Sequence, residues 1–172
     1  MASPDSLNWI NRGIREVTRI LRATPELMDG SALPGGRGVV ARVDEHELDR
    51  DRMPEGTAIY AAVRWGGNRL SDFNTAGSTD YTLAVTVHLE ARLPITCSPA
   101  ERMQIWSRLQ RAVAVLPLIA ARENRGGRFN GISGITRVTD SDPGDDVVEE
   151  EAAYYPFTDT AFLLEVTLPD DE

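Results

Sequence analysis

The sequence contains no lysine. All 18 of its basic residues are arginine, 27 residues are acidic, and the net charge at pH 7 is −9. A net-negative chain does not attract the phosphate backbone as a whole, which disfavours general nucleic-acid binding but leaves room for a local basic patch. The lack of lysine is most simply explained by a GC-rich coding sequence. The alternative is a preference for arginine at interfaces, where its planar guanidinium makes bidentate contacts.

Cysteine and long apolar runs are also scarce. The single cysteine, Cys97, cannot form an internal disulfide, so nothing points to an oxidising compartment. No stretch approaches the roughly 20 apolar residues of a membrane span. The first residues do not have the charged-then-apolar pattern of a signal peptide. We therefore expect a cytosolic chain with no membrane partner.

Residues for catalysis are few. Of the two histidines, His46 lies in a charge run and His88 lies on the polar face of an expected strand, beside Glu90. Two such side chains are the least that a metal site needs, but no cysteine pair accompanies them, so a solvated or hydrogen-bonded histidine is favoured. Cys97 would be a nucleophile only if a histidine approached it, and a small buried residue is the favoured interpretation.

Motifs for phosphate or calcium are incomplete. The glycine clusters at 35–38 and 126–128 lack the Gly-Lys-Ser/Thr ending of a phosphate-binding loop, so we interpret them as turns. Asp140, Asp142 and Glu151 imitate part of a calcium loop, but the glycine and the spacing do not fit. We predict no catalytic residue, no cofactor and no metal ligand.

The stretch from Tyr81 to Leu116 has the clearest pattern. Apolar and polar residues alternate through the first ten positions, which predicts a half-buried strand. Ser98, Pro99 and Glu101 then have the spacing of a helix N-cap with a capping box. An apolar stripe at helical spacing follows, made of Met103, Trp106, Leu109, Val113 and Leu116. We expect the strand and the helix to cover each other, with a kink or stop at Pro117 and a continuation to about Arg122.

The remaining elements complete an α+β pattern. A helix of about 20 residues is expected from Ser3 to before Thr24. Further short strands are expected at 39–43, 57–65, 131–138 and 160–168. The order α-β-β-β-α-β-β predicts a mostly antiparallel sheet of about four to five strands packed against two main helices. Residues 1–172 are expected to form one domain, with flexible loops near 66–80 and in the acidic turn 140–151.

These segments together resemble the tail terminator, or tail-completion, proteins of long-tailed bacteriophages. The resemblance rests on the helix Trp9–Arg15, the loop containing Pro34-Gly35-Gly36, the strand Asp80–Val87 that leads into the Ser98-capped helix, and the closing strand Thr160–Thr167. It spans most of the chain and is a resemblance of pattern. It implies an α+β subunit of a virion, made in the host cytoplasm, that forms a ring, usually of six copies.

The resemblance implies binding and not catalysis. The ring would end polymerisation of the tail-tube protein and present a surface to the head-completion or connector protein, while DNA passes through the lumen without specific binding. The candidate partner or lumen contacts are Asp140, Asp142, Asp145, Asp146, Glu149, Glu150 and Glu151 in the acidic turn, and Arg69, Asp72 and Phe73 in the expected loop. The chain is somewhat long for this family, which leaves a neighbouring neck protein as the alternative. A small enzyme that uses Cys97 or His88 is the more distant one.

Overall fold

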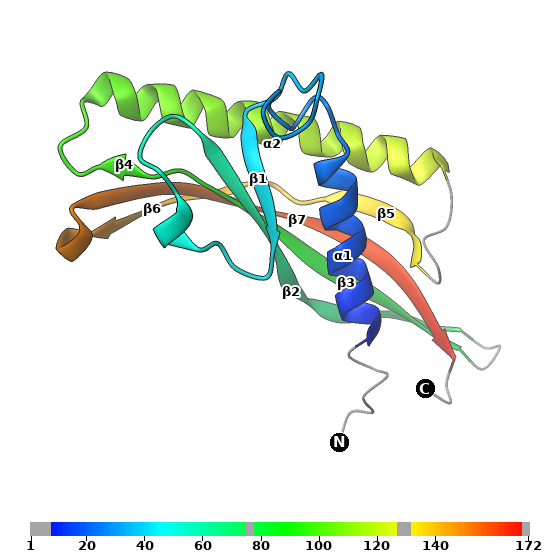
Figure 1. The fold of residues 1–172 in the computed structure, drawn as a ribbon. Coiled ribbons are helices and arrows are strands. Elements are labelled where there is room, and N and C mark those ends of the chain that lie inside the picture. The colour runs from blue at the N-terminus through cyan, green and yellow to red at the C-terminus, as the bar shows by residue number, and fades with distance from the viewer. Residues whose placement is uncertain (1–7, 75–77, 127–131, 170–172) are drawn as a thin grey trace.

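The computed structural model describes residues 8–74, 78–126 and 132–169 (Figure 1). In chain order its elements are α1 (Asn8–Arg22), β1 (Val40–Glu45), the 3₁₀ turn η1 (Arg50–Arg52), β2 (Ile59–Asn74), β3 (Ser78–Glu90), β4 (Leu93–Pro94), α2 (Pro99–Gly126), β5 (Ile132–Val138), β6 (Asp142–Val148), the 3₁₀ turn η2 (Glu149–Glu151) and β7 (Ala153–Pro169). The expected α+β class and order of the main elements are confirmed. In the described residues the sheet has seven strands, because β4 and β6 add to those expected.

The sheet is built on β7. All 13 residues of β3 pair antiparallel with one edge of β7, and β6 and β5 pair with its other edge. β2 pairs with the free edge of β3, and β1 lies parallel to β2. The spatial order is therefore β1, β2, β3, β7, and then β6 and β5. β1 and the β6–β5 row lie at opposite edges of the sheet.

The start of α2 has the local structure that the sequence predicts. The Ser98 backbone N–H donates to Glu101 Oε2 at 2.6 Å, and the Glu101 N–H donates to Ser98 Oγ at 3.2 Å. These two bonds satisfy backbone donors that a helix start otherwise leaves free, which is the capping box. Further along, α2 continues through Pro117 to Gly126. A stop at Pro117 is therefore wrong, and the helix runs beyond the expected Arg122; Ile119 and Ala120, which follow the proline, are buried in the core.

The buried stripe of α2 differs in part from the expected one. Leu109 and Leu116 are fully buried, whereas Met103 is 71% exposed. The buried side chains follow a spacing of four and three along Ile105, Leu109, Ala112, Leu116 and Ile119. The helix also packs mainly over β5 and β7, and α1 is the helix that covers β3. The strand and helix of the expected unit therefore share one core without covering each other directly.

α1 lies close to the sheet because of a glycine. A Cβ atom on Gly13 would approach Leu83 Cδ2 to 2.7 Å, so any larger side chain there would have to push the Leu83 side chain aside. On the same face of the helix, Ile14, Val17 and Leu21 are buried in the core that also receives α2. Both helices thus cover one face of the sheet. The expected start of α1 at Ser3 lies outside the described residues.

A smaller apolar cluster lies on the opposite face. Met53, Tyr60, Ala153 and Tyr155 are buried there under the chain that crosses from β1 to the parallel strand β2. The expected charge run at 44–52 forms part of this crossover. It is not wholly solvated, because Met53 anchors the crossover to the sheet and η1 lies directly before it.

The expected flexible loop at 66–80 is wrong in the described residues. β2 and β3 continue as a hairpin, with pairs from Gly67↔Ala84 to Asn74↔Ser78. The glycines that suggest a loop belong instead to a bulge, where Gly67 has a φ of +104°. Arg69, Asp72 and Phe73 therefore lie on β2; their side chains, and residues 75–77, are outside the described part.

The expected acidic turn at 140–151 is also mostly a strand. β6 pairs with β7 from Asp142↔Asp159 to Val148↔Ala153, and only η2 is a turn. Gly144 lets the Phe157 ring lie over the strand, because a Cβ there would lie 2.3 Å from Cζ of that ring. Charged residues are typical of edge strands, where they discourage uncontrolled pairing. Separately, none of the helices in the described part of the chain has the length and apolarity needed to cross a membrane.

We predict that the two leucines on opposite sides of α2 differ sharply in their effect on stability. Leu109→Ala should lower the free energy of unfolding by about 2–5 kcal/mol, because it leaves a cavity in the main core. Leu118→Ala, at a position 59% exposed, should change it by no more than about 0.5 kcal/mol. Urea unfolding measures both, and equal losses would contradict the packing of α2.

Candidate functional site

The helix-free face of the sheet carries a charged hollow of about 410 Å³. Its walls are Glu47, Leu48, Arg50, Ala62, Arg64, His88, Glu90, Asp145, Asp146 and Phe157. These residues come from the crossover after β1 and from β2, β3, β6 and β7. His88 and Glu90 point into the hollow because they alternate along β3 with Val87 and Leu89, which are buried in the main core.

Glu90 and Arg50 form the centre of the hollow. The Glu90 side chain is only 2% exposed, and Arg50 binds it bidentately, Nε to Oε1 at 3.0 Å and Nη2 to Oε2 at 2.9 Å. The same guanidinium donates through Nη1 to Asp146 Oδ2 at 2.7 Å and lies 4.0 Å from the centre of the Tyr155 ring. Arg50 therefore connects the crossover to β3, β6 and β7. Its hydrogen bond to Glu90 is the main reason that its own pKa is raised.

His88 lies between two carboxylates. Its Nδ1 is 2.8 Å from Asp159 Oδ1, and its Nε2 is 3.0 Å from Glu90 Oε2. Ionised carboxylates are acceptors, so the protonated imidazolium, with one N–H on each ring nitrogen, is the form of His88 that satisfies both contacts. Burial lowers the pKa of His88, but the hydrogen bonds to Asp159 and Glu90 outweigh it, and the pKa is raised overall. Arg64 Nη2 donates to Asp159 Oδ1 at 3.2 Å and completes the network.

The network balances its own charges. Three cations, Arg50, Arg64 and His88, contact three carboxylates, Glu90, Asp146 and Asp159. Burial is the largest single influence and raises the pKa values of Glu90 and Asp159, but the hydrogen bonds and charges of His88 and the neighbouring arginines together outweigh it, and both are lowered overall. The imidazolium has no free lone pair with which to accept a proton. In this state the hollow holds the crossover on the sheet and offers no general base at His88.

The other expected nucleophile lies elsewhere. Cys97 is buried in the main core, on the helix-covered face of the sheet, and Arg102 Nε donates to its Sγ at 3.4 Å. His88 lies on the opposite face, so the structure does not bring the two together. Among the described residues, no group of three His, Cys, Asp or Glu side chains is placed to hold a metal ion.

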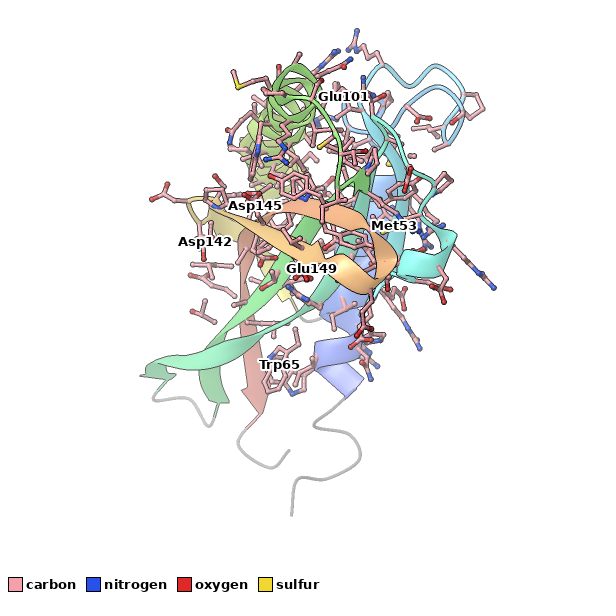
Figure 2. The ribbon with its side chains drawn as sticks, turned by 90° about the vertical axis from the view of Figure 1, so that its left-hand side faces the viewer. Met53, Trp65, Glu101, Asp142, Asp145 and Glu149 are labelled. Atoms are coloured by element: carbon pink, nitrogen blue, oxygen red, sulfur yellow. The ribbon has the colours of Figure 1, made fainter. Side chains whose placement is uncertain are left out.

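The acidic candidates are spread along β6 and η2 and do not form one cluster (Figure 2). Asp146 belongs to the hollow, through Arg50. Asp145 accepts a hydrogen bond from the Tyr154 hydroxyl at 2.7 Å, and Glu151 accepts one from the Tyr155 hydroxyl at 2.5 Å. Burial, together with these carboxylates, raises the pKa of both tyrosines to about 12.

Four further acidic candidates stay exposed. They are Asp140, Asp142, Glu149 and Glu150. The carboxylates of all four are without a hydrogen-bond or ion-pair partner among the residues that the structure describes. These side chains are therefore available for a contact outside the subunit.

No family model matches the chain, and no curated protein matches it. The function must therefore be argued from the geometry and from the resemblance of pattern.

Sequence reasoning missed Arg50, Arg64 and Asp159 as parts of the site. Asp159 could have been placed from the sequence, because alternation with the apolar Phe162 and Leu164 puts position 159 on the polar face of the strand. Arg50 could not have been placed in the site from the sequence, because it lies in a charge run that is typical of a solvated loop.

We predict a pH window for the stability that this network contributes. The folded pKa of His88 lies above 6.5, so its contribution is complete below pH 6.5 and is lost as the pH rises through the folded value. Glu90 and Asp159 have folded pKa values below 4.5 and 3.8, so their contributions are complete above pH 4.5 and are lost on acidification. The difference in unfolding free energy between wild type and His88→Gln should be largest between pH 4.5 and 6.5. A pH-independent difference would contradict the assignment.

We also predict that Glu90→Gln is costly although it preserves the shape of the side chain. It should lower the free energy of unfolding by about 3 kcal/mol, because it leaves His88 and part of Arg50 without their buried counter-charge. The matched control is Glu150→Gln at an exposed position on η2, which should cost no more than about 0.5 kcal/mol. Urea unfolding at neutral pH compares them, and a Glu90 variant as stable as the control would refute the role of Glu90.

Proposed function

We propose that this chain is a structural bacteriophage protein that forms a ring at the head-proximal end of the tail tube. The ring ends polymerisation of the tube and joins the tail to the head-completion complex. Each subunit acts by binding, through one contact to the next copy and through two ring faces that meet different partners.

One observation carries the proposal. The two strands on which the resemblance rests, Asp80–Val87 and Thr160–Thr167, pair residue for residue with each other, from Asp80↔Thr167 to Val87↔Thr160. The helix Trp9–Arg15 of the resemblance packs onto the same strands at Gly13, next to Leu83 and Leu164. Segments far apart in the sequence thus form one contiguous unit. Segments that resemble the family only by chance would not be expected to contact one another in this way.

The charged hollow is consistent with a binding role. The cations and carboxylates of its ion-pair network neutralise one another within the subunit, and the two carboxylates beside His88 favour the imidazolium, which has no lone pair to accept a proton. With a net charge of −9, a ring of such subunits would let duplex DNA pass through its lumen without adhering, since like charges repel.

The proposal predicts rings that cap tubes. When the purified chain is mixed with polymerising tail-tube protein, negative-stain images should show rings with a central hole, and such rings at one end of tubes that have stopped growing. The control is tube protein alone, whose tubes should continue to lengthen.

Two other results are informative. A chain that stays monomeric beside growing tubes would refute the proposal. Rings that bind a head-completion protein and ignore tube ends would instead favour the alternative, a neighbouring neck protein.

A further inference from the structure

One face of α1 is a row of arginines. Arg12, Arg15, Arg19 and Arg22 follow one another at spacings of three and four, which places them on one side of the helix, and all four are exposed. The buried side of the helix faces the main core. We call these four residues the arginine face. From the helical rise, their Cα atoms span about 15 Å.

Three of the four arginines of this face have no counter-charge. Arg19 pairs with Glu16 on the same helix, and Arg22 donates to the backbone oxygen of Val43 at 2.7 and 3.0 Å, which leaves its charge in place. In the described part of the chain, Arg12 and Arg15 have no hydrogen-bond or ion-pair partner. The arginine face therefore carries free positive charge on a protein whose net charge is −9.

The complementary surface is the acidic edge, which we define as β6 together with η2. It carries six carboxylates, from Asp142, Asp145, Asp146, Glu149, Glu150 and Glu151, and one of them, Asp146, has a cation partner in Arg50. β6 alone spans about 20 Å, a length close to that of the arginine face. Within the described residues β6 pairs only with β7, so its outer backbone edge is open.

A single copy does not bring the two surfaces together. The acidic edge lies at one end of the strand order, beyond β7, whereas α1 packs over β1, β2 and β3. Figure 1 shows α1 and β6 well apart, and Figure 2 looks onto the acidic edge, with Asp142, Asp145 and Glu149 labelled on it. Each surface is therefore free to meet a surface of a second copy.

We propose that the arginine face of one copy docks on the acidic edge of the next copy in the ring. The inference rests on the proposed function and specifies its contact between subunits. The acidic edges of two copies would repel each other, because both are negatively charged. A contact built on these surfaces therefore joins the arginine face of one copy to the acidic edge of another, which is a head-to-tail contact. A head-to-tail contact that repeats closes into a ring when the rotation permits. The acidic edge thus faces the neighbouring subunit and not the lumen.

The test is a charge exchange between two variants. In Arg12→Glu/Arg15→Glu the charge of half of the arginine face is reversed, a change of −4, and in Glu149→Arg/Glu150→Arg two carboxylates of the acidic edge are replaced by arginines, a change of +4. Each variant alone should need at least about a hundredfold higher concentration than wild type for half-assembly, since like charges now face each other. An equimolar mixture should recover assembly, because each variant then finds its complement in the other. Native mass spectrometry should find equal numbers of both variants in every ring.

The matched control is Arg37→Glu/Arg52→Glu. It changes the net charge as much as the α1 variant does, at two exposed arginines outside both surfaces, 75% and 78% exposed. Its rings should persist, and circular dichroism should show that all variants are folded. Loss of rings in the control would assign the effect to net charge and overturn the docking contact.

The remaining outcomes separate this inference from the proposed function. Rings that persist in both reversed variants, or a mixture that stays dissociated, would overturn the docking contact and leave the ring function standing. Duplex DNA binding that the α1 reversal abolishes while rings persist would assign the arginine face to nucleic acid and also overturn the contact. A wild-type chain that forms no ring, with or without tube protein, would remove both proposals.

Discussion

The structure depends on the pairing of β3 with β7. These strands are joined over all 13 residues of β3, although the chain between them contains α2, β5 and β6. The ladder satisfies the backbone groups of both strands and provides the apolar face that α1 and α2 cover. It also gives β2 and β6 the edges on which they pair. Because contacts this distant in sequence must all form together, folding depends on the nearly complete chain.

The two faces of the sheet are stabilised differently. On the helix-covered face, alternating side chains such as Val85 and Leu164 are buried in one large apolar core. On the other face, the crossover after β1 is held by Met53 and by the ion pairs of Arg50. A buried ion pair of this kind adds little net stability compared with apolar packing, but losing one partner is costly. The network therefore fixes the position of the crossover more than it strengthens the fold.

Local features were predictable from the sequence, and long-range ones were not. The capping box of Ser98 and Glu101 is read correctly because all its atoms lie within one turn. Arg50 could not be placed, because its two carboxylate partners are 40 and 96 residues away and their positions are set by the sheet. The glycine-rich segment after Trp65 is a bulged hairpin, and its composition alone does not distinguish such a hairpin from a loop. For the same reason the acidic composition of β6 did not indicate a strand. The Phe157 ring lies over Gly144 in that strand, and this contact between distant residues is not visible in the sequence.

The proposed ring depends on identical copies of this chain that join head to tail through oppositely charged surfaces. Sedimentation velocity of the wild-type chain at low and at high salt tests it most directly, since the Debye length falls from about 10 Å at 0.1 M salt to about 3 Å at 1 M. We expect one discrete closed oligomer at low salt that dissociates to monomers as the salt concentration rises. A monomer under all conditions, or an oligomer that is indifferent to salt, would contradict it.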